Sequence, residues 1–317
     1  MIQVITLGEA MVALTPQQRG PLRYATGFQR GMGGAEANFA IGVARLGTGC
    51  RYLSRLGNDE FGHYIRHELR GDGVDVSFIP LVDGRPTGLN VKEVREDGGG
   101  RTFYYRSGSA ASTMAPEDLV TAQFAGAQWL HISGVFPAVS ESARATVYRA
   151  VELARSAGLT VALDPNIRLK LWDVETARRV LLDLITRVDI VYPGDAEGQI
   201  LFGTADPEAI ARAAMRLGPK TVVVKQGEKG ATGYTVDGAV VHVPAFQVPT
   251  VDTVGAGDGW AAGFTVGTLR GMDFGAAIRL GNAVGAMVCA LAGDVEGLPD
   301  WEDVQAFLGE APARVER

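Results

Sequence analysis

The chain carries, late in its 317 residues, the stretch Val251-Asp252-Thr253-Val254-Gly255-Ala256-Gly257-Asp258-Gly259-Trp260. A helical pattern of apolar and small residues follows it over residues 261–269. Gly255 and Gly257 allow a tight turn that brings the backbone close to a ligand. Because the first amides of a helix have no partner within the helix, the amides of residues 255–258 are predicted to point outward and bind an anion.

Asp258 adds a carboxylate to these predicted anion-binding amides. The amides suit a migrating phosphoryl group and the carboxylate suits the proton of a hydroxyl, so together they predict phosphoryl transfer to an alcohol. A carboxylate at a helix start is expected to stay ionised, since the helix dipole favours its charged form. The plain structural interpretation is a glycine turn in which Asp258 caps the helix.

Two other phosphate-binding motifs fit this stretch less well. A dinucleotide fingerprint needs Gly-x-Gly-x-x-Gly in the first βαβ unit, whereas position 260 is Trp and the stretch lies near the end of the chain. A Walker A loop needs a Gly-Lys dipeptide, which the chain lacks.

Outward from this stretch, short apolar runs alternate with helical patterns. Strands are predicted at residues 2–7, 129–132, 160–163, 190–192 and 221–224, and helices at 141–157, 174–186 and 207–217. This alternation indicates βαβ units and an α/β fold, in which a mostly parallel sheet is covered on both faces. Ligands of such sheets bind beyond the carboxyl ends of the strands.

Residues 12–30 and 87–106 interrupt this pattern. Both segments alternate polar and apolar residues and carry turn signals, at 18–21 and at 97–100. They are predicted to form antiparallel hairpins inserted between the α/β elements. A small sheet made from the two insertions would serve as a lid or an interaction surface.

Composition excludes several classes of protein. The chain is 46% hydrophobic and 21% charged, which is typical of a globular protein with a sizeable core. The net charge of −6 argues against general nucleic-acid or membrane-surface binding.

The longest uncharged apolar stretch, at 283–293, is too short to span a bilayer, and residues 1–5 lack the features of a signal peptide. Cys50 and Cys289 are expected to be free thiols, so we expect a cytoplasmic protein.

A second glycine cluster, at residues 31–34, precedes a predicted helix of small residues at 39–46. Gly33 and Gly34 can bring backbone amides against sugar hydroxyls, and Asn38 can add a side-chain hydrogen bond. The plain alternative is close packing of helix against sheet.

Three motifs carry a family resemblance: Gly33-Gly34-x-x-x-Asn38, Gly57-x-Asp59-x-x-Gly62 and Asp252-Thr253-x-Gly255-Ala256-Gly257-Asp258. Over nearly the whole chain, the sequence resembles the ribokinase-like (PfkB) carbohydrate kinases. The resemblance implies one domain over 1–317, a three-layer α/β/α Rossmann-like fold with a β-sheet lid from 12–30 and 87–106. It also implies ATP-dependent phosphorylation of a primary hydroxyl, with Asp258 as base and Gly255, Ala256 and Gly257 in the anion hole.

The resemblance further implies a nucleotide site and a metal site. The nucleotide-binding positions are Gly194, Lys225, Gly227, Gly230 and Asn282, of which Asn282 matches a position near the adenine. A plain β-turn is the alternative for the Lys225-x-Gly227-x-x-Gly230 loop. Glu197 matches the acidic end of the family's Asn-x-x-Glu element, which helps hold Mg²⁺ through water. Gly194 stands in place of the Asn and has no side chain to contact nucleotide or metal-bound water. A monovalent-cation requirement is left open.

Within the family, the chain is most similar to the 2-keto-3-deoxygluconate kinases, through residues 101–110 and 164–172. Arg106 and Arg168 match residues that bind the carboxylate of the sugar acid, for which a planar guanidinium is well suited. The remaining substrate-side positions are Gly33, Gly34, Asn38, Asn90, Tyr104 and Asp294. Asn90 stands where related kinases can have an aromatic lid residue.

The sequence therefore predicts a kinase that uses ATP and Mg²⁺ to phosphorylate the terminal hydroxyl of 2-keto-3-deoxygluconate. One alternative is the same chemistry on a neutral sugar such as fructose, ribose or a nucleoside-like compound. Another is a non-catalytic sugar-binding protein with the same fold. The expected partners are a small sugar acid and ATP, without nucleic acid or membrane, and the lid offers a surface for a homo-oligomer.

Overall fold

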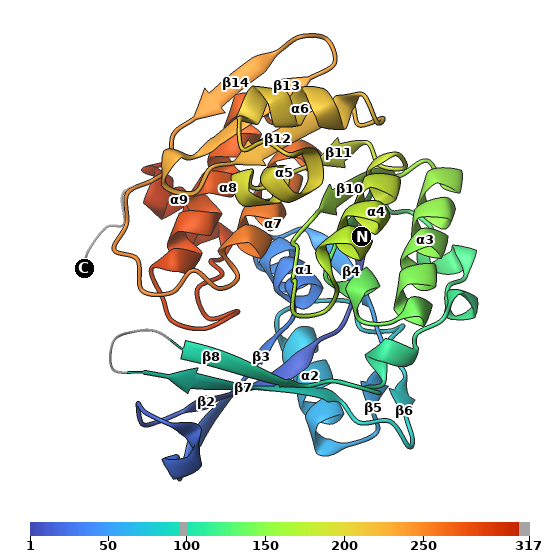
Figure 1. Cartoon of the computed structure of the whole chain (residues 1–317), viewed down its shortest axis with the longest axis vertical. Helices are drawn as coiled ribbons and strands as arrows, with labels where there is room; N and C mark the ends of the chain where they lie inside the picture. The colour runs from blue at the N-terminus through green and yellow to red at the C-terminus, as the bar shows by residue number, and fades with distance from the viewer. Residues whose placement is uncertain (96–99, 311–317) are drawn as a thin grey trace.

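The computed structural model describes residues 1–95 and 100–310 (Figure 1). Its strands are β1 (Ile2–Leu7), β2 (Met11–Pro16), β3 (Phe28–Gly33), β4 (Gly49–Leu53), β5 (Leu56–Gly57), β6 (Leu81–Val82), β7 (Gly88–Val94), β8 (Gly100–Tyr105), β9 (Trp129–Ser133), β10 (Thr160–Asp164), β11 (Ile190–Val191), β12 (Thr221–Lys225), β13 (Ala231–Thr235) and β14 (Val240–Val243). Its α-helices are α1 (Ala35–Arg45), α2 (Glu60–Gly71), α3 (Glu141–Ser156), α4 (Val174–Ile185), α5 (Asp195–Phe202), α6 (Pro207–Met215), α7 (Ala256–Leu269), α8 (Phe274–Cys289) and α9 (Trp301–Leu308).

The main sheet has eight strands in the order β14-β13-β12-β11-β10-β9-β1-β4. The strands from β12 to β4 pair in parallel, whereas β13 and β14 extend one edge as an antiparallel hairpin. The strands and helices predicted from the alternating pattern are confirmed, with ends that differ by at most two residues. The α/β prediction is therefore correct, and the antiparallel edge is an addition to it.

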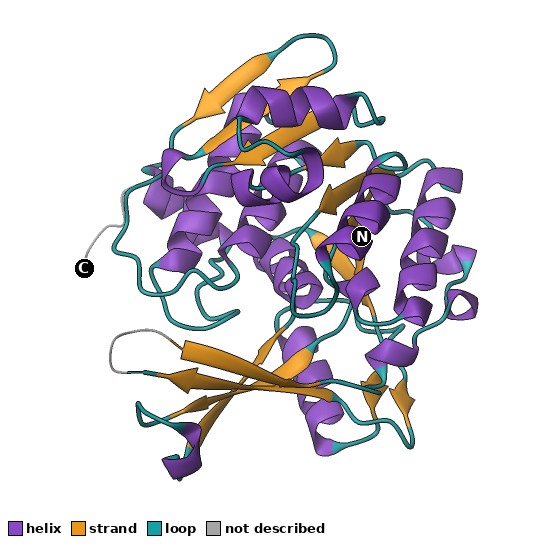
Figure 2. Cartoon of the chain, viewed as in Figure 1, coloured by secondary structure: helices purple, strands orange, loops and turns teal. Residues whose placement is uncertain are grey.

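Alternate residues along each central strand enter two separate cores. In β9, Leu130 and Ile132 pack with α3, α4, α5 and α6, whereas Trp129 packs on the opposite face with α1, α7 and α8. This alternation follows from the two-residue period of a strand. Figure 2 shows the resulting arrangement, with helices on both faces of the sheet. The helix predicted at 39–46 begins earlier, at Ala35, because Gly34 at φ 139° turns the chain directly from β3 into α1.

A small sheet with the order β3-β2-β7-β8 lies beside the α/β part (Figure 1). The two predicted antiparallel hairpins are confirmed as the pairs β2–β3 and β7–β8, and parallel pairing of β2 with β7 joins them. The predicted turn at 97–100 lies mostly outside the described residues. Opposite partners share one face, so Asn90 and Tyr104 face the same side, and Phe103 and Tyr105 face the other.

Within residues 1–95 and 100–310, no helix has the length and apolar character needed to cross a membrane. The helix α8, which contains most of the apolar stretch noted in the sequence, packs instead against α7 in the core.

Candidate active site

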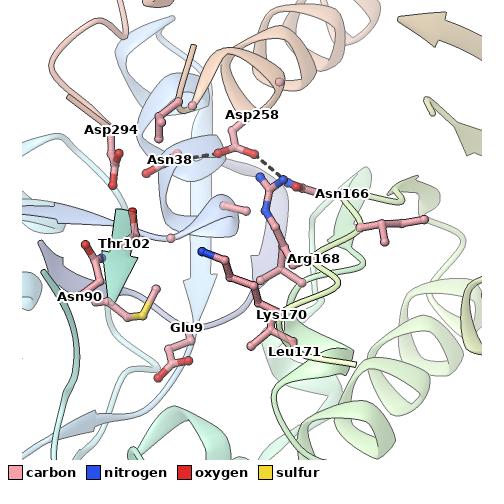
Figure 3. A pocket seen from close by; sticks show the side chains of 18 of the residues that line it. Glu9, Asn38, Asn90, Thr102, Asn166, Arg168, Lys170, Leu171, Asp258 and Asp294 are labelled. Carbon is pink, nitrogen blue, oxygen red and sulfur yellow. Dashed lines mark hydrogen bonds between the residues drawn. The ribbon is translucent and has the colours of Figure 1, made fainter. Parts of the chain in front are cut away.

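A cavity of about 890 Å³ lies between the small sheet and the carboxyl ends of the main-sheet strands (Figure 3). Its wall includes Asn90, Lys92, Thr102, Tyr104 and Arg106 from the small sheet and the loop after it, Asp164, Asn166, Arg168 and Lys170 from β10 and the loop after it, and Gly255, Gly257, Asp258 and Asp294 from the C-terminal part. Chain segments far apart in the sequence therefore meet where α/β sheets place their ligands.

Asp258 is buried in the first turn of α7 and has two amide partners. Its Oδ2 accepts a hydrogen bond of 2.9 Å from Asn38 Nδ2, and its Oδ1 accepts one of 3.2 Å from Asn166 Nδ2. Burial raises the pKa of Asp258 to about 7, although the Asn38 hydrogen bond and the Arg168 charge oppose this shift. The helix dipole was expected to keep this carboxylate ionised, but loss of water outweighs the dipole, so the group is fully ionised only above about pH 7.

The helix start beside Asp258 offers amides to an anion. Gly255, at φ 79°, turns the chain into α7, and a Cβ there would lie 2.6 Å from the carbonyl oxygen of Asp294. The amide of Ala256 was predicted to be free, but it donates to Thr253 O at 3.3 Å, because the tight turn folds it back. In the described part of the chain, the amides of Gly255, Gly257 and Asp258 have no protein acceptor, so the predicted anion site loses only the Ala256 amide.

Lys225 lies close to this helix start. A Cβ on Gly257 would lie 3.8 Å from Lys225 Nζ, which also forms a 2.7 Å ion pair with the buried Asp164. A cation and free amides therefore surround the same small space, which favours a phosphate there.

Glu197 lines the same cavity from the first turn of α5. Its two carboxylate oxygens accept backbone amides, from Ile167 at 2.9 Å and from Gly194 at 2.8 Å. Burial, followed by the neighbouring charge of Asp164, raises the pKa of Glu197. The position where Gly194 replaces an Asn thus contributes a backbone amide that orients this carboxylate.

The structure does not bring every predicted nucleotide residue to the cavity wall. Gly227 and Gly230 lie in the turn after β12, both at positive φ. The buried Asn282 donates to the carbonyls of Val243 and Pro244 and accepts from the indole of Trp260. These three positions lie outside the cavity wall, as does Gly194, and the contact of all four with a nucleotide stays a prediction.

Arg106 follows the end of β8, lines the cavity and is paired with the carboxylate of Glu9. Its Nε donates to the buried Glu9 at 2.7 Å, and Ser109 Oγ donates to the other oxygen of Glu9 at 2.5 Å. On the same face of the small sheet as Asn90, Lys92 Nζ forms a 2.7 Å ion pair with Asp294. Gly33 packs tightly against Asp294, leaving no room for a side chain, and Gly34 does the same against the backbone of Glu9.

Two cavity residues present buried oxygens without a partner. Asn38 Oδ1 and Asn90 Oδ1 accept no hydrogen bond from the described residues. Unpaired buried acceptors are costly, so they indicate a ligand that donates hydrogen bonds, as sugar hydroxyls do.

Sequence reasoning missed Glu9, Lys92, Asn166 and Lys170 as cavity residues. Asn166 gives the clearest sequence signal, because a polar residue shortly after a predicted strand lies at the carboxyl edge of the sheet. In the structure it is the one non-glycine residue at positive φ in the described ranges (φ 35°), a conformation that Asn tolerates. Glu9 and Lys92 form ion pairs with residues distant in the sequence, and Lys170 is recognised only by its place on the cavity wall.

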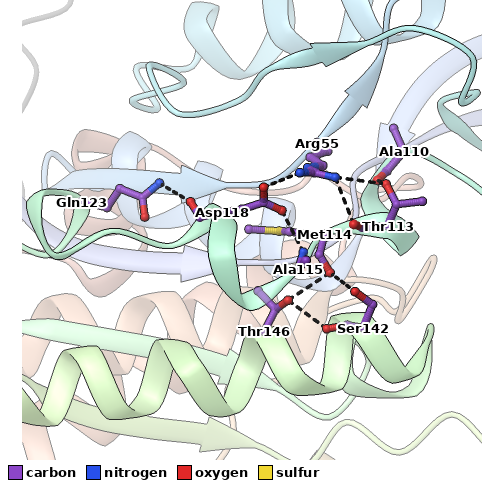
Figure 4. Close-up of polar contacts among 9 residues, drawn as sticks. All are labelled: Arg55, Ala110, Thr113, Met114, Ala115, Asp118, Gln123, Ser142 and Thr146. Carbon is purple, nitrogen blue, oxygen red and sulfur yellow. Dashed lines mark hydrogen bonds and ion pairs between the residues drawn. The ribbon is translucent and has the colours of Figure 1, made fainter.

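A second cavity, of about 330 Å³, lies beside Arg55, whose polar contacts are drawn in Figure 4. Arg55 forms an ion pair with Asp118 and donates to Thr113 O, while Asp118 also accepts the amide of Ala115. These contacts tie the chain before β9 to the rest of the fold, so this cavity has the features of a structural junction, although Nε of Arg55 has no hydrogen-bond partner among the described residues.

A buried carboxylate next to an anion-binding helix start, in a cavity that offers partners to hydroxyls, suits the transfer of a phosphoryl group to a small alcohol. The fold and the site therefore place the protein in the class of small-molecule kinases. The chain belongs to the pfkB family of carbohydrate kinases, whose family model matches residues 1–301. This membership confirms both the predicted ribokinase-like fold class and the predicted phosphotransferase activity.

Similar proteins cover almost the whole chain. The 2-dehydro-3-deoxygluconokinase of Bacillus subtilis (strain 168) is 39% identical over 97% of this chain and 95% of its own length. The protein of the same name from Thermoproteus tenax is 36% identical over 97% and 94%. Among solved structures, a provisional ribokinase II of Escherichia coli in complex with ATP and Mg²⁺ is 28% identical, with a TM-score of 0.90 over 98% of this chain and 99% of its own.

Proposed function

We propose that this kinase transfers the γ-phosphoryl group of ATP to the terminal hydroxyl of 2-keto-3-deoxygluconate, the compound also called 2-dehydro-3-deoxygluconate. The product is 2-keto-3-deoxy-6-phosphogluconate. The names of the two similar kinases support this substrate. The observation that carries the proposal is the position of Asp258 beside the free amides of α7, in one cavity with several cationic side chains.

Asp258 acts as the general base. Its pKa of about 7 lies close to neutral pH, where a base is both deprotonated and able to hold a proton. Asn38 and Asn166 orient the two carboxylate oxygens, so that one of them can receive the proton of the sugar hydroxyl. The hydroxyl oxygen then attacks the phosphorus atom, and ADP leaves.

The amides of Gly257 and Asp258, together with the ammonium group of Lys225, stabilise the charge on the transferring phosphoryl group. In the free protein, Lys225 is paired with Asp164. A phosphate near Gly257 adds a second anionic partner within reach of the same ammonium group.

The cavity also fits Mg²⁺. Mg²⁺ is usually held by one or two carboxylates, several waters and the phosphates of the nucleotide. Glu197 and Asp164 are buried carboxylates on this wall, and the described residues contain no cluster of three or more His, Cys, Asp or Glu side chains that would form a full protein cage. Glu197 and Asp164 would hold the hydrated ion, which when bound supplies neutralising charge to the phosphates.

The acid end of the substrate fits the cationic side chain of Arg106, whereas Arg168 extends toward Asp258. The unpaired oxygens of Asn38 and Asn90 fit the hydroxyls of the substrate. The small sheet acts as a lid that excludes water from the phosphoryl group. Phe103 and Tyr105 on its outer face are exposed and support a homo-oligomer through the lid. The use of ATP and the two free cysteines support a cytoplasmic location.

An ADP-release screen with 2-keto-3-deoxygluconate, other sugar acids, fructose and ribose tests this function, in the presence and absence of potassium. We expect the largest kcat/KM for 2-keto-3-deoxygluconate. Asp258→Asn is expected to lose turnover by a factor of about 10²–10⁴ while the sugar still binds. A larger kcat/KM for a neutral sugar would replace the proposed substrate, and full activity of Asp258→Asn would remove the base.

A further inference from the structure

Five cationic side chains line the cavity, and their pairing differs. Three have a carboxylate partner: Lys92 with Asp294, Arg106 with Glu9, and Lys225 with Asp164. Arg168 and Lys170 have no ion pair within the described residues. These two side chains therefore bring charge to the cavity that the protein itself does not neutralise.

The two unpaired cations occupy different parts of the cavity. Figure 3 shows the Arg168 side chain extended toward Asn166 and Asp258, and the charge of Arg168 lowers the pKa of Asp258. The Lys170 side chain instead points into the cavity, and its Nζ lies 6.0 Å from the centre of the Tyr104 ring on the small sheet. The guanidinium of Arg106 lies at the same distance from that ring.

Although the side chain of Lys170 is exposed, hydrogen bonds and a buried neighbour fix the backbone around it. The loop after β10 turns at Lys170, where the amide of Leu171 donates to Arg168 O at 2.9 Å. The buried Trp172 anchors the end of this turn, and Asn166 anchors its start through Asp258. The lysine is thus presented to the cavity from a fixed position on the α/β part.

We propose that Lys170 is a specificity-determining residue that binds the carboxylate of the sugar-acid substrate, a step that rests on the proposed function. In such a substrate, the carboxylate and the reacting hydroxyl are at opposite ends of the carbon chain. When the hydroxyl lies at Asp258, the carboxylate points away from it and toward the group formed by Tyr104, Arg106 and Lys170. Because the charge of Arg106 is already shared with Glu9, Lys170 supplies the additional positive charge that a carboxylate needs.

The test compares three variants with the wild type, using 2-keto-3-deoxygluconate and a neutral ketohexose. Lys170→Met removes the charge and keeps a side chain of similar size, Lys170→Arg keeps the charge, and Lys220→Met removes an exposed lysine outside the cavity wall. Lys170→Met is expected to raise the KM for the acid about tenfold, with little change in kcat or in the KM for the neutral sugar. Lys170→Arg is expected to recover most of the affinity, and Lys220→Met to resemble the wild type.

Calorimetric titration of 2-keto-3-deoxygluconate into each protein gives a second readout that does not need turnover. The proposal is supported if, of the three variants, only Lys170→Met binds the acid more weakly than the wild type, and if this difference in affinity becomes smaller at high salt. Equal binding by the wild type and Lys170→Met overturns the role of Lys170 and leaves the proposed function intact. A rise in KM for both sugars shows a merely structural role and also overturns it. A wild type that neither binds nor phosphorylates the acid overturns the proposed function and this inference together.

Discussion

The Nδ2 atom of Asn38 lies 2.9 Å from Oδ2 of Asp258, although 220 residues separate them in the sequence. The two residues belong to two of the three glycine-containing motifs, one at the start of α1 and the other at the start of α7. Packing of these helices against the same face of the main sheet makes the two motifs parts of one site.

Burial of Asp258 sets the pH dependence expected of the enzyme, and the Asn38 hydrogen bond opposes the effect of burial. We expect the kcat/KM of the wild type to fall tenfold per pH unit well below about pH 7, where Asp258 becomes protonated. A hydrogen bond to a carboxylate favours its charged form, so Asn38→Ala raises the pKa of Asp258 and moves this acid limb to higher pH. Rate measurements from pH 5 to 9 check the shift. Asn58→Ala, which removes an exposed hydrogen bond to Asp83, is the control and should keep the wild-type profile.

The burial of Asp258 lowers stability at neutral pH. Its pKa is about 7 in the folded protein and ordinarily 3.8, so the folded state binds the proton more tightly. Stability therefore falls as pH rises from about 4 to about 7, and the full cost is present above pH 7. Asp258→Asn removes this dependence. We expect its Tm relative to the wild type to be higher at pH 8 than at pH 5, by at least ~2 °C. The same Tm difference at both pH values would show that the carboxyl is not held in this way.

The pair of Arg106 and Glu9 is expected to behave as a unit in unfolding experiments. Arg106→Ala leaves the buried Glu9 carboxylate without its cation, which costs about 3–5 kcal/mol. The double variant Arg106→Ala/Glu9→Gln no longer carries the unpaired charge. Its free energy of unfolding in urea should therefore lie between those of the wild type and Arg106→Ala. Arg212→Ala, which breaks an exposed ion pair with Glu208, serves as the control and should cost little. Equal losses in the single and double variants would show that the charge of Glu9 is not the cause.

Alanine substitutions at Gly255 and Gly257 are expected to have different effects, the first on the stability of the fold and the second on phosphate binding. Gly255→Ala forces a side chain into a left-handed backbone and against Asp294 O, so it should destabilise the fold by about 1–2 kcal/mol or more. Gly257→Ala meets no atom closer than Lys225 Nζ at 3.8 Å, so its stability should be near that of the wild type. Its added methyl group, however, enters the proposed phosphate site, and we expect a lower kcat/KM for ATP. Unchanged kinetics of Gly257→Ala would argue against a phosphate at this place.

Much of the fold could be predicted because its signals are local. Strands such as β9 and β10 are short apolar runs, and helices such as α3 show regular apolar spacing, so their alternation is visible in the sequence. The parallel pairing of β2 with β7 is different, since it joins two hairpins that are far apart in the chain and leaves no local pattern.

The site was predictable where its residues are contiguous. Gly255, Gly257 and Asp258 belong to one stretch, and the cavity contains all three. The pairs Lys92–Asp294 and Arg106–Glu9 join distant segments, so residue type alone does not reveal them. The pKa of Asp258 was misjudged for the same reason, because its burial depends on how those segments pack around it.

The ion pairs Lys92–Asp294 and Arg106–Glu9 connect the small sheet, or the loop directly after it, to the rest of the chain. We expect these charges to part and become hydrated when the small sheet moves to release the phosphorylated sugar. Dissolved ions screen opposite charges that meet water, so we expect rising ionic strength to hasten product departure while it weakens the capture of an anionic sugar. The rate of turnover should therefore be highest at an intermediate salt concentration, where neither substrate binding nor product release alone limits the rate.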